Sequence, residues 1–225
     1  MVDLWVATAP LDVAPCLSSA DVQRAIAFVY DVDRERWTRS RSIVRRILAA
    51  RYVSTCPEQI GFAAHPGGKP YVEGSTLEFN LSHSRDAVAL AVSDSGPVGV
   101  DIEWSNPETD VTELTDTVFH PDEMRFWRRS GASHAIFYRL WCAKEAAAKA
   151  EGTGFVVDPK LFVTSRWDHD HCFVRGTRQL WRATIAVENE YTLCVATPAC
   201  ADAAIRRFSI AEQLGCVREF REVAS

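Results

Sequence analysis

Three acidic side chains in two separate segments are the residues of this chain best suited to chemistry. Asp101 and Glu103 lie in an apolar, β-branched run at residues 98–104, and Glu145 lies downstream in a segment rich in alanine and lysine. Mg²⁺ prefers oxygen ligands, needs only a few carboxylates and usually completes its shell with water and substrate phosphate. The three acids therefore indicate a magnesium site that acts on a polyphosphate.

The first two acids are expected on one strand that begins after the break at residues 95–97. Side chains alternate between the faces of a strand, so Asp101 and Glu103 point the same way. Two carboxylates on one face, with no lysine or arginine between them, repel each other unless a cation or a proton intervenes. Taken alone, the segment is better explained by two exposed acids at a strand end.

The third acid is expected on a helix that spans about residues 134–150 and stops near Gly152. Trp141, Glu145 and Lys149 are spaced four apart, so they share one face of that helix. A helix-stabilising Glu-Lys pair, worth about 0.2–0.5 kcal/mol, is the simpler explanation of this spacing. It leaves the acid pair on the strand unexplained.

The remaining elements are predicted from apolar periodicity and from turn residues. Helices are expected at residues 18–29 and 33–52 and from Pro121 onward, and strands at residues 2–7, 60–64, 77–81, 87–93, 98–104, 161–164, 171–174, 181–187 and 191–196. Each half of the chain thus reads as helices followed by a strand meander.

Composition limits the class of protein. The chain has 225 residues, of which 47% are hydrophobic and 24% charged, enough for one large or two small globular domains. The net charge of −5 argues against nucleic acid as the main partner. Seven scattered cysteines without a Cys-x-x-Cys pair indicate reduced thiols, and no apolar run approaches the ~20 residues of a membrane span. We expect a cytoplasmic monomer that binds neither nucleic acid nor membrane.

Four segments, in order, resemble the motifs of one enzyme family. Residues 99–103 (Gly-Val-Asp-Ile-Glu) and 141–149 (Trp-Cys-Ala-Lys-Glu-Ala-Ala-Ala-Lys) are similar to the paired signature of the surfactin-type 4′-phosphopantetheinyl transferases. Residues 67–71 resemble the Gly-Lys-Pro turn of that family, and residues 79–84 resemble its Asn-x-Ser-His-Ser segment. Each motif alone is weak, but the ordered set is specific.

The resemblance implies an α+β fold. Two similar subdomains would be related by a pseudo-twofold, each with helices packed on a small antiparallel sheet and with the active site in the cleft between them. The expected divisions are a coenzyme A-binding subdomain at residues 1–98, a metal-binding and catalytic subdomain at residues 99–197, and a C-terminal extension at residues 198–225. A strand near residues 205–210 and a short helix are expected in the extension.

The resemblance also implies a reaction, the Mg²⁺-dependent transfer of 4′-phosphopantetheine from coenzyme A to a serine of an apo acyl or peptidyl carrier protein. Adenosine 3′,5′-bisphosphate would be released. Asp101, Glu103 and Glu145 are the implied Mg²⁺ ligands. Glu145 would also accept the serine proton, and Lys149 would contact the pyrophosphate as a point charge. Lys144 is expected either to be structural or to face the partner protein.

Four further residues are implied to bind coenzyme A. Lys69 would contact a phosphate, Ser82 and His83 would contact the 3′-phosphate, and Arg36 would reach the nucleotide phosphates. The other arginines at residues 33–52 are expected mostly on a solvated face.

Two other functions remain as alternatives. A non-catalytic module of the same fold could bind coenzyme A or a carrier protein without turnover. Another Mg²⁺-dependent phosphotransferase is also conceivable, although the chain lacks the Gly-x-x-x-x-Gly-Lys-Ser/Thr loop of P-loop enzymes. His169 and His171 could suggest a transition-metal site, but their polar surroundings are more simply a hairpin turn.

Overall fold

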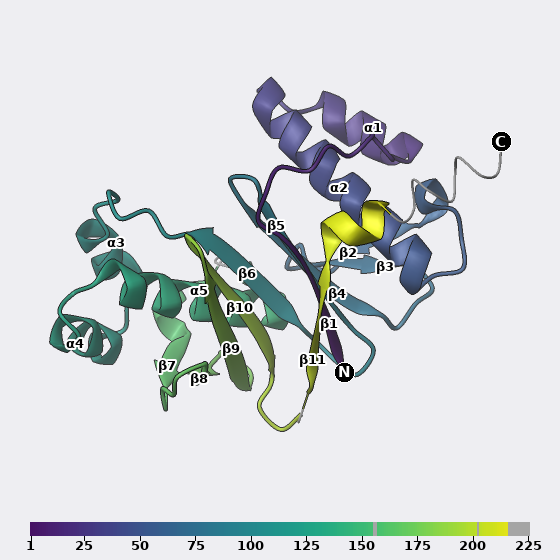
Figure 1. Ribbon diagram of the computed structural model, residues 1–225. Coiled ribbons are helices and arrows are strands. Elements are labelled where there is room, and N and C mark those ends of the chain that lie inside the picture. The colour runs from purple at the N-terminus through teal and green to yellow at the C-terminus, as the bar shows by residue number, and fades with distance from the viewer. Residues whose placement is uncertain (155–156, 202, 216–225) are drawn as a thin grey trace.

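Two sheets of unequal size carry the two halves of the chain (Figure 1). The structure, a computed structural model, describes residues 1–154, 157–201 and 203–215. One sheet has the strand order β11-β1-β5-β4, the other β6-β10-β9-β8-β7, and β2 and β3 form a separate pair. The elements are β1 (Val2–Ala7), α1 (Ser19–Ile26), α2 (Asp31–Arg51), β2 (Phe62–Ala64), β3 (Pro70–Val72), β4 (Glu78–Ser84), β5 (Ala87–Ser93), β6 (Gly99–Trp104), α3 (Thr112–Val118), α4 (Pro121–Arg129), α5 (His134–Glu151), β7 (Val163–Ser165), β8 (His171–Arg175), β9 (Leu180–Glu188), β10 (Tyr191–Pro198) and β11 (Ile205–Ser209).

Helix α2 covers the four-stranded sheet. Its apolar positions recur with the helical period, and Ile43, Ile47 and Leu48 are fully buried. They share one core cluster with Phe79 of β4 and Leu90 of β5, which lie on the sheet face that α2 covers. The amphipathic pattern of this helix therefore forms the core of the N-terminal half.

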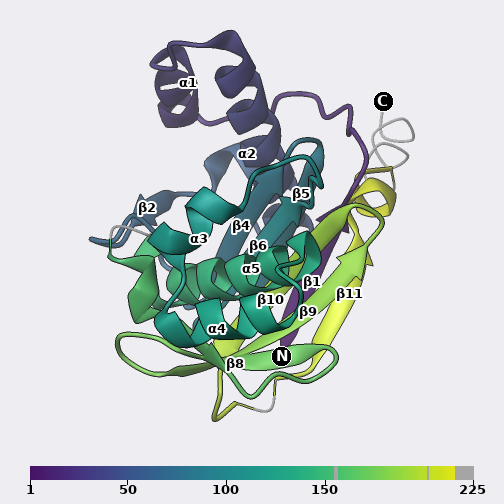
Figure 2. The ribbon, with the colours of Figure 1, turned by 90° about the vertical axis from the view of Figure 1, so that its left-hand side faces the viewer.

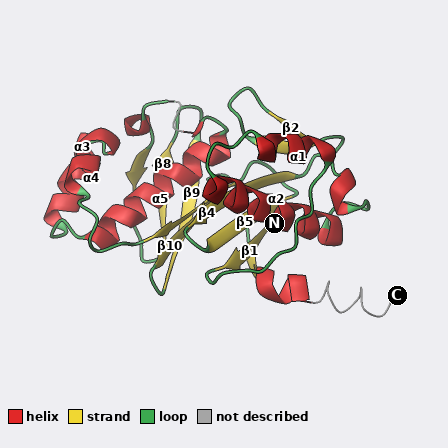
Figure 3. Ribbon diagram, turned by 90° about the horizontal axis from the view of Figure 1, so that it is seen from above, coloured by secondary structure: helices red, strands yellow, loops and turns green. Residues whose placement is uncertain are grey.

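Helix α5 covers the five-stranded sheet in the same way, and Figure 2 shows α3, α4 and α5 in front of its strands. The buried side of α5 consists mainly of cysteine and alanine, including Cys142, Ala143 and Ala146. These residues pack with Trp181 of β9 and Cys194 of β10. Because the helix residues are small, the helix axis can lie close to the sheet. Seen from above, α3 and α4 lie at one end of the molecule, and α5 runs from that end toward the middle, where α2 also begins (Figure 3).

The two sheets also pack against each other, which makes β5 buried along its whole length. Ala87, Ala89 and Ala91 of β5 share a core cluster with Val100 of β6 and Val195 of β10. The alanines alternate with larger residues that face α2, as the two-residue period of a strand requires. The layers are therefore α2, the four-stranded sheet, the five-stranded sheet and α5. This agrees with the two-subdomain α+β architecture that the resemblance implies.

The C-terminal part returns to the first half of the molecule. β11, the strand expected near residues 205–210, pairs in parallel with β1, and Arg206 bonds Asp3 at 2.8 Å between Nε and Oδ1. Residues 210–215 are helical, as expected after that strand, and residues 216–225 lie outside the described residues. The predicted extension thus supplies an edge strand to the sheet of the N-terminal half.

Three sequence predictions need correction. The strand expected at residues 60–64 is shortened to β2 because a 3₁₀ turn at Pro57–Gln59 precedes it, and the strand expected at residues 161–164 starts two residues late behind a similar turn. The expectation of mostly solvated arginines on α2 is wrong for Arg45, which is 1% exposed. Its guanidinium donates to Asp21 and to two backbone carbonyls, and these bonds compensate its burial.

The cysteines behave as expected where they are described. Six of them, all except Cys216, lie within the described residues, and these six are free thiols. Across the described ranges, no helix combines the length and the apolar character that crossing a membrane requires.

The contact between β6 and α5 depends on Gly99. A Cβ at this position would lie 2.0 Å from the carbonyl oxygen of Ala146 and 2.5 Å from the backbone nitrogen of Ala150. Both atoms belong to the α5 backbone, so neither can rotate away. Gly99→Ala is expected to lower the free energy of unfolding by about 1–3 kcal/mol, measured by urea denaturation.

Gly215→Ala is the control, because a Cβ there meets no atom of the described residues within 4 Å. It should change stability by no more than about 0.5 kcal/mol. Equal stability of the two variants would contradict the close approach of α5 to β6.

Candidate active site

Helix α5 places Glu145 and Lys149 at the junction of the two halves. The helix begins after Ser133, whose side chain accepts the N–H of Ile136, and ends at Gly152 in the left-handed conformation. In its second half most side chains are buried, whereas Trp141, Glu145 and Lys149 are half-buried on one face. The shared face predicted from their spacing is confirmed.

Strand β6 brings the acid pair to the same place. Val100 and Ile102 point into the core between the sheets, so Asp101 and Glu103 point the other way, toward α5. Asp101 is 2% exposed, whereas Glu103 is half-buried. The strand thus supplies two carboxylates to the face that carries Glu145.

Lys149 and Ser82 hold Asp101. The Lys149 ammonium lies 2.7 Å from Asp101 Oδ1 and donates to Ser82 Oγ at 3.1 Å. Ser82 Oγ in turn donates to Asp101 Oδ1 at 3.0 Å. The second oxygen, Oδ2, is buried and has no hydrogen-bond partner among the described residues. A buried carboxylate oxygen without a partner is costly, so this atom is open to a cation.

Burial and neighbouring charges shift the pKa values of Glu103, Glu145 and Lys149. Burial, and next the charge of Asp101, raise the pKa of Glu145 from 4.5 to about 7, with Lys149 opposing and Glu103 adding to the rise. Burial and Asp101 likewise raise the pKa of Glu103. Burial disfavours the charged form of Lys149, but Asp101 and Glu145 outweigh that effect and raise its pKa. Several negative charges therefore share one lysine.

These residues meet the chemical requirements of a Mg²⁺ site, although their side chains do not yet form one. The donors are carboxylate oxygens, which suit a hard cation, and no described group forms a hydrogen bond with Asp101 Oδ2. Among residues 1–154, 157–201 and 203–215, no group of three histidine, cysteine, aspartate or glutamate side chains is arranged to hold an ion. Asp101 forms its ion pair with the Lys149 ammonium instead.

The raised pKa of Glu145 predicts how stability depends on pH without metal. Between about pH 4.5 and 7 the folded protein keeps a proton on Glu145 that the unfolded chain releases. The free energy of unfolding should therefore fall as the pH rises through this window. Glu145→Gln should flatten this fall, measured by urea denaturation in a chelator at about pH 5, 6, 7 and 8.

Glu113→Gln, which changes an exposed acid on α3, is the control and should keep the pH slope of the wild type. If Glu145→Gln has the same slope as the wild type, Glu145 does not keep its proton in the folded protein.

The structure separates Ser82 from His83. Successive residues of β4 point to opposite faces, so Ser82 faces Asp101 whereas His83 lines a cavity of about 360 Å³ beside α2. Partial burial, and next the charges of Lys149, Arg36 and Arg39, lower the pKa of His83. The side chain is exposed on that face. A joint contact of Ser82 and His83 with one phosphate, as the sequence predicts, therefore has to bridge both faces of the strand.

The same cavity contains ligand candidates that the sequence did not single out. Arg24, Trp37, Arg41 and Phe62 line it together with His83. The Arg41 guanidinium lies 3.9 Å from the ring centroid of Phe62, so a cation and an aromatic ring stand together. The arginine-rich pattern of α2 was the available signal, but only the tertiary structure shows which arginines face the cavity. Arg36, the predicted ligand, is exposed nearby.

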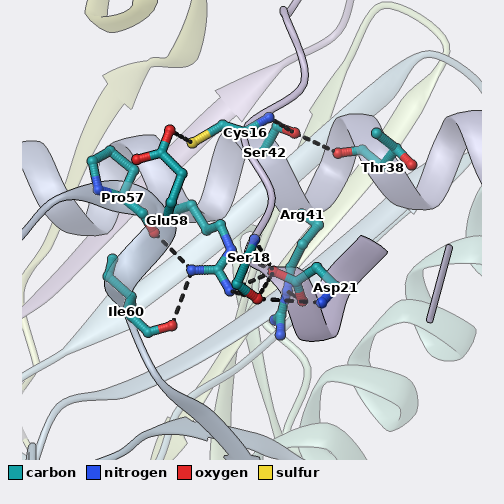
Figure 4. A network of polar contacts seen from close by, with 10 residues as sticks. Cys16, Ser18, Asp21, Thr38, Arg41, Ser42, Pro57, Glu58 and Ile60 are labelled. Atoms are coloured by element: carbon teal, nitrogen blue, oxygen red, sulfur yellow. Dashed lines mark hydrogen bonds and ion pairs between the residues drawn. The ribbon is translucent and has the colours of Figure 1, made fainter. Parts of the chain in front are cut away.

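A buried network holds Arg41 in place (Figure 4). Asp21 accepts from Arg41 Nε at 2.8 Å and from Arg45 Nε at 2.6 Å, and Arg45 also donates to the Ser18 hydroxyl. Burial would raise the pKa of Asp21, but the hydrogen bonds and charges of the arginines lower it. Ser18 caps α1, so the network fixes α1 on α2 and thereby forms one wall of the cavity.

The Lys69 side chain of the Gly-Lys-Pro turn points away from the cavity beside α2. Gly68 and Pro70 line the cavity beside α2, whereas Lys69 is 8% exposed and lines a larger cavity of about 800 Å³. Its ammonium lies 2.7 Å from Glu78 and 3.4 Å from the Ala150 carbonyl. Lys69 thus joins the two halves, and its phosphate contact stays a prediction.

Comparisons with known proteins identify the family of this chain. A family model described as "4'-phosphopantetheinyl transferase superfamily" matches residues 97–205, and one described as "4'-phosphopantetheinyl transferase, N-terminal" matches residues 8–95. The 4′-phosphopantetheinyl transferase of Bacillus subtilis is 30% identical over 203 residues, which cover 80% of this chain and 86% of that protein. The chain belongs to the 4′-phosphopantetheinyl transferase family.

Other members of the 4′-phosphopantetheinyl transferase family match shorter stretches. The transferase HetI of Nostoc sp. is 36% identical over 149 residues, 64% of this chain and 62% of that protein. The transferase AcpT of Salmonella typhi is 36% identical over 116 residues, 51% of this chain and 59% of that protein. The chain therefore covers about three fifths of the length of these two relatives.

Proposed function

We propose that the protein transfers 4′-phosphopantetheine from coenzyme A to a serine of an apo acyl or peptidyl carrier protein and releases adenosine 3′,5′-bisphosphate. Family membership supports the reaction class. The observation that carries the proposal is that three carboxylates and one lysine, Asp101, Glu103, Glu145 and Lys149, lie together between the two halves. The carboxylates could bind a cation, and the lysine could bind a phosphate, as a reaction on a pyrophosphate requires.

The acids would hold Mg²⁺. Asp101, Glu103 and Glu145 are the proposed ligands, and the unpartnered Asp101 Oδ2 supports the assignment. When bound, the ion would neutralise the charge that develops on the pyrophosphate as it is cleaved. Lys149, freed from Asp101, would then contact the pyrophosphate as a point charge.

Glu145 is the proposed base. A serine hydroxyl must lose its proton as its oxygen attacks the β-phosphate, and a base works best when its pKa lies near the working pH. The pKa of Glu145 is raised to about 7 in the metal-free protein, and a bound cation would lower it again, so the assignment rests on the place of Glu145 beside Asp101 and Lys149. Glu145 would accept the proton directly or through a water.

The nucleotide end of coenzyme A would lie in the cavity beside α2. Arg24, Arg41 and His83 offer donors for a phosphate, while Trp37 and Phe62 offer rings for an adenine. Arg36 and Lys69 would contribute from the margins of this cavity and of its larger neighbour. We further propose that the protein acts as a cytoplasmic monomer; its free described cysteines support a reducing compartment.

Mass spectrometry of carrier proteins tests the proposal. Purified protein with Mg²⁺ and coenzyme A should raise the mass of at least one apo carrier by one phosphopantetheine unit, and chelation of Mg²⁺ should stop the gain. No mass gain across a panel of acyl and peptidyl carriers would overturn the proposal. Carrier binding without any mass gain would instead identify a binding module.

A further inference from the structure

The edges of the two sheets are joined by side chains of β4 rather than by a backbone ladder. Val100 N–H donates to Asn80 Oδ1 at 2.9 Å, Ile102 N–H to Ser82 Oγ at 3.3 Å and Trp104 N–H to Ser84 Oγ at 3.0 Å. Each acceptor thus lies twenty positions before its donor. The regular offset shows that β4 and β6 run in the same direction along this junction.

Strand geometry explains the pattern. Alternate side chains of β4 point to the same side, and alternate N–H groups of β6 point to the same edge. A buried N–H needs an acceptor, which in a sheet is the carbonyl of a neighbouring strand. Here the oxygens of Asn80, Ser82 and Ser84 take that place.

Each of the two serines also donates to a carboxylate, and Ser82 accepts from Lys149 as well. A hydroxyl carries one proton and two lone pairs, so it can accept from an N–H and donate to a carboxylate at the same time. Ser82 donates to Asp101 Oδ1 at 3.0 Å, and Ser84 donates to Glu103 Oε2 at 2.9 Å. In both cases the carboxylate belongs to the residue just before the N–H donor. Within the described residues, the Asn80 side chain has one hydrogen bond, which it accepts from the Val100 N–H.

Glu103 depends on Ser84 more than on its other partner. Its second oxygen, Oε1, accepts from Trp141 Nε1 at 3.4 Å, which is at the long end for a hydrogen bond. The 2.9 Å bond from Ser84 is shorter, and the Trp104 N–H holds the Ser84 hydroxyl in place.

We propose that Ser84 is a positioning residue for Glu103: the N-terminal half uses this hydroxyl to orient a carboxylate of the C-terminal half. Its importance for metal binding rests on the proposed function. Asn80 is then a residue of the same junction that joins the halves without orienting an acid.

Three variants distinguish a residue that orients the Glu103 carboxylate from a residue that only joins the two halves. Ser84→Ala removes both bonds of the hydroxyl, Ser84→Thr keeps a hydroxyl on a residue that suits a strand, and Asn80→Ala removes a junction bond without touching an acid. The measurements are the free energy of unfolding, the dissociation constant for Mn²⁺ without coenzyme A, and the Glu103 rotamer in crystal structures of the variants.

Ser84→Ala should weaken Mn²⁺ binding about tenfold or more and change the Glu103 rotamer. Ser84→Thr should restore both, and Asn80→Ala should lower stability while leaving both unchanged. An unchanged Glu103 rotamer in Ser84→Ala, or an equal loss of Mn²⁺ affinity in Asn80→Ala, overturns the inference. A wild-type protein that binds no Mn²⁺ or modifies no carrier would count against the proposed function. The inference about Ser84 would still be decided by the Glu103 rotamer.

Discussion

Asp101→Asn is expected to lower phosphopantetheine transfer about a thousandfold. Asparagine keeps the shape of the side chain and removes its charge, so Lys149 loses its ion pair with Asp101 and the proposed Mg²⁺ site loses a charged ligand. A thousandfold loss corresponds to about 4 kcal/mol of transition-state stabilisation, which one metal ligand can supply. The rate of carrier modification, followed by mass spectrometry at saturating coenzyme A, measures the effect.

Asp116→Asn is the control, because Asp116 is an exposed acid on α3. It should transfer at the rate of the wild type. Urea denaturation of Asp101→Asn should show a folded protein, so that a lost rate reports chemistry. A folded Asp101→Asn variant that transfers within threefold of the wild type would exclude Asp101 from the proposed site.

Lys144→Met is expected to lower the free energy of unfolding by about 3–5 kcal/mol. Lys144 is 0% exposed, and its ammonium donates to Glu123 and to the Phe162 carbonyl. Burial would lower the pKa of Lys144 further if Glu123 did not oppose it. Methionine fills the space but leaves the Glu123 carboxylate buried without its cation. Urea denaturation at pH 7 measures the loss.

The double variant Lys144→Met with Glu123→Gln is the sharper test. Glutamine can still accept from the backbone N–H of Thr164, as Glu123 Oε1 does, but it carries no charge. The double variant should therefore be more stable than the sum of the two single losses predicts. Strictly additive losses would show that the two side chains do not act as an ion pair.

The role of Lys144 shows one limit of sequence reasoning. The signature of residues 141–149 places Glu145, Lys149 and Lys144 on one short helix, and the helical period separates the first two from the third. That period correctly predicted which side chains share a face. It could not distinguish a structural lysine from a partner-facing one, because Glu123 comes from α4 and the Phe162 carbonyl from beyond the helix.

The same division holds for the whole protein. The acids, Lys149, the helix and strand that carry them and the family could all be predicted from the chain, because period, turn chemistry and motif order are local properties of a sequence. The burial of Arg45, the opposite directions of Ser82 and His83, and the use of β4 side chains along the edge of β6 became visible only in the folded molecule. Those outcomes depend on which distant groups meet and on the cost of leaving a buried polar group without a partner.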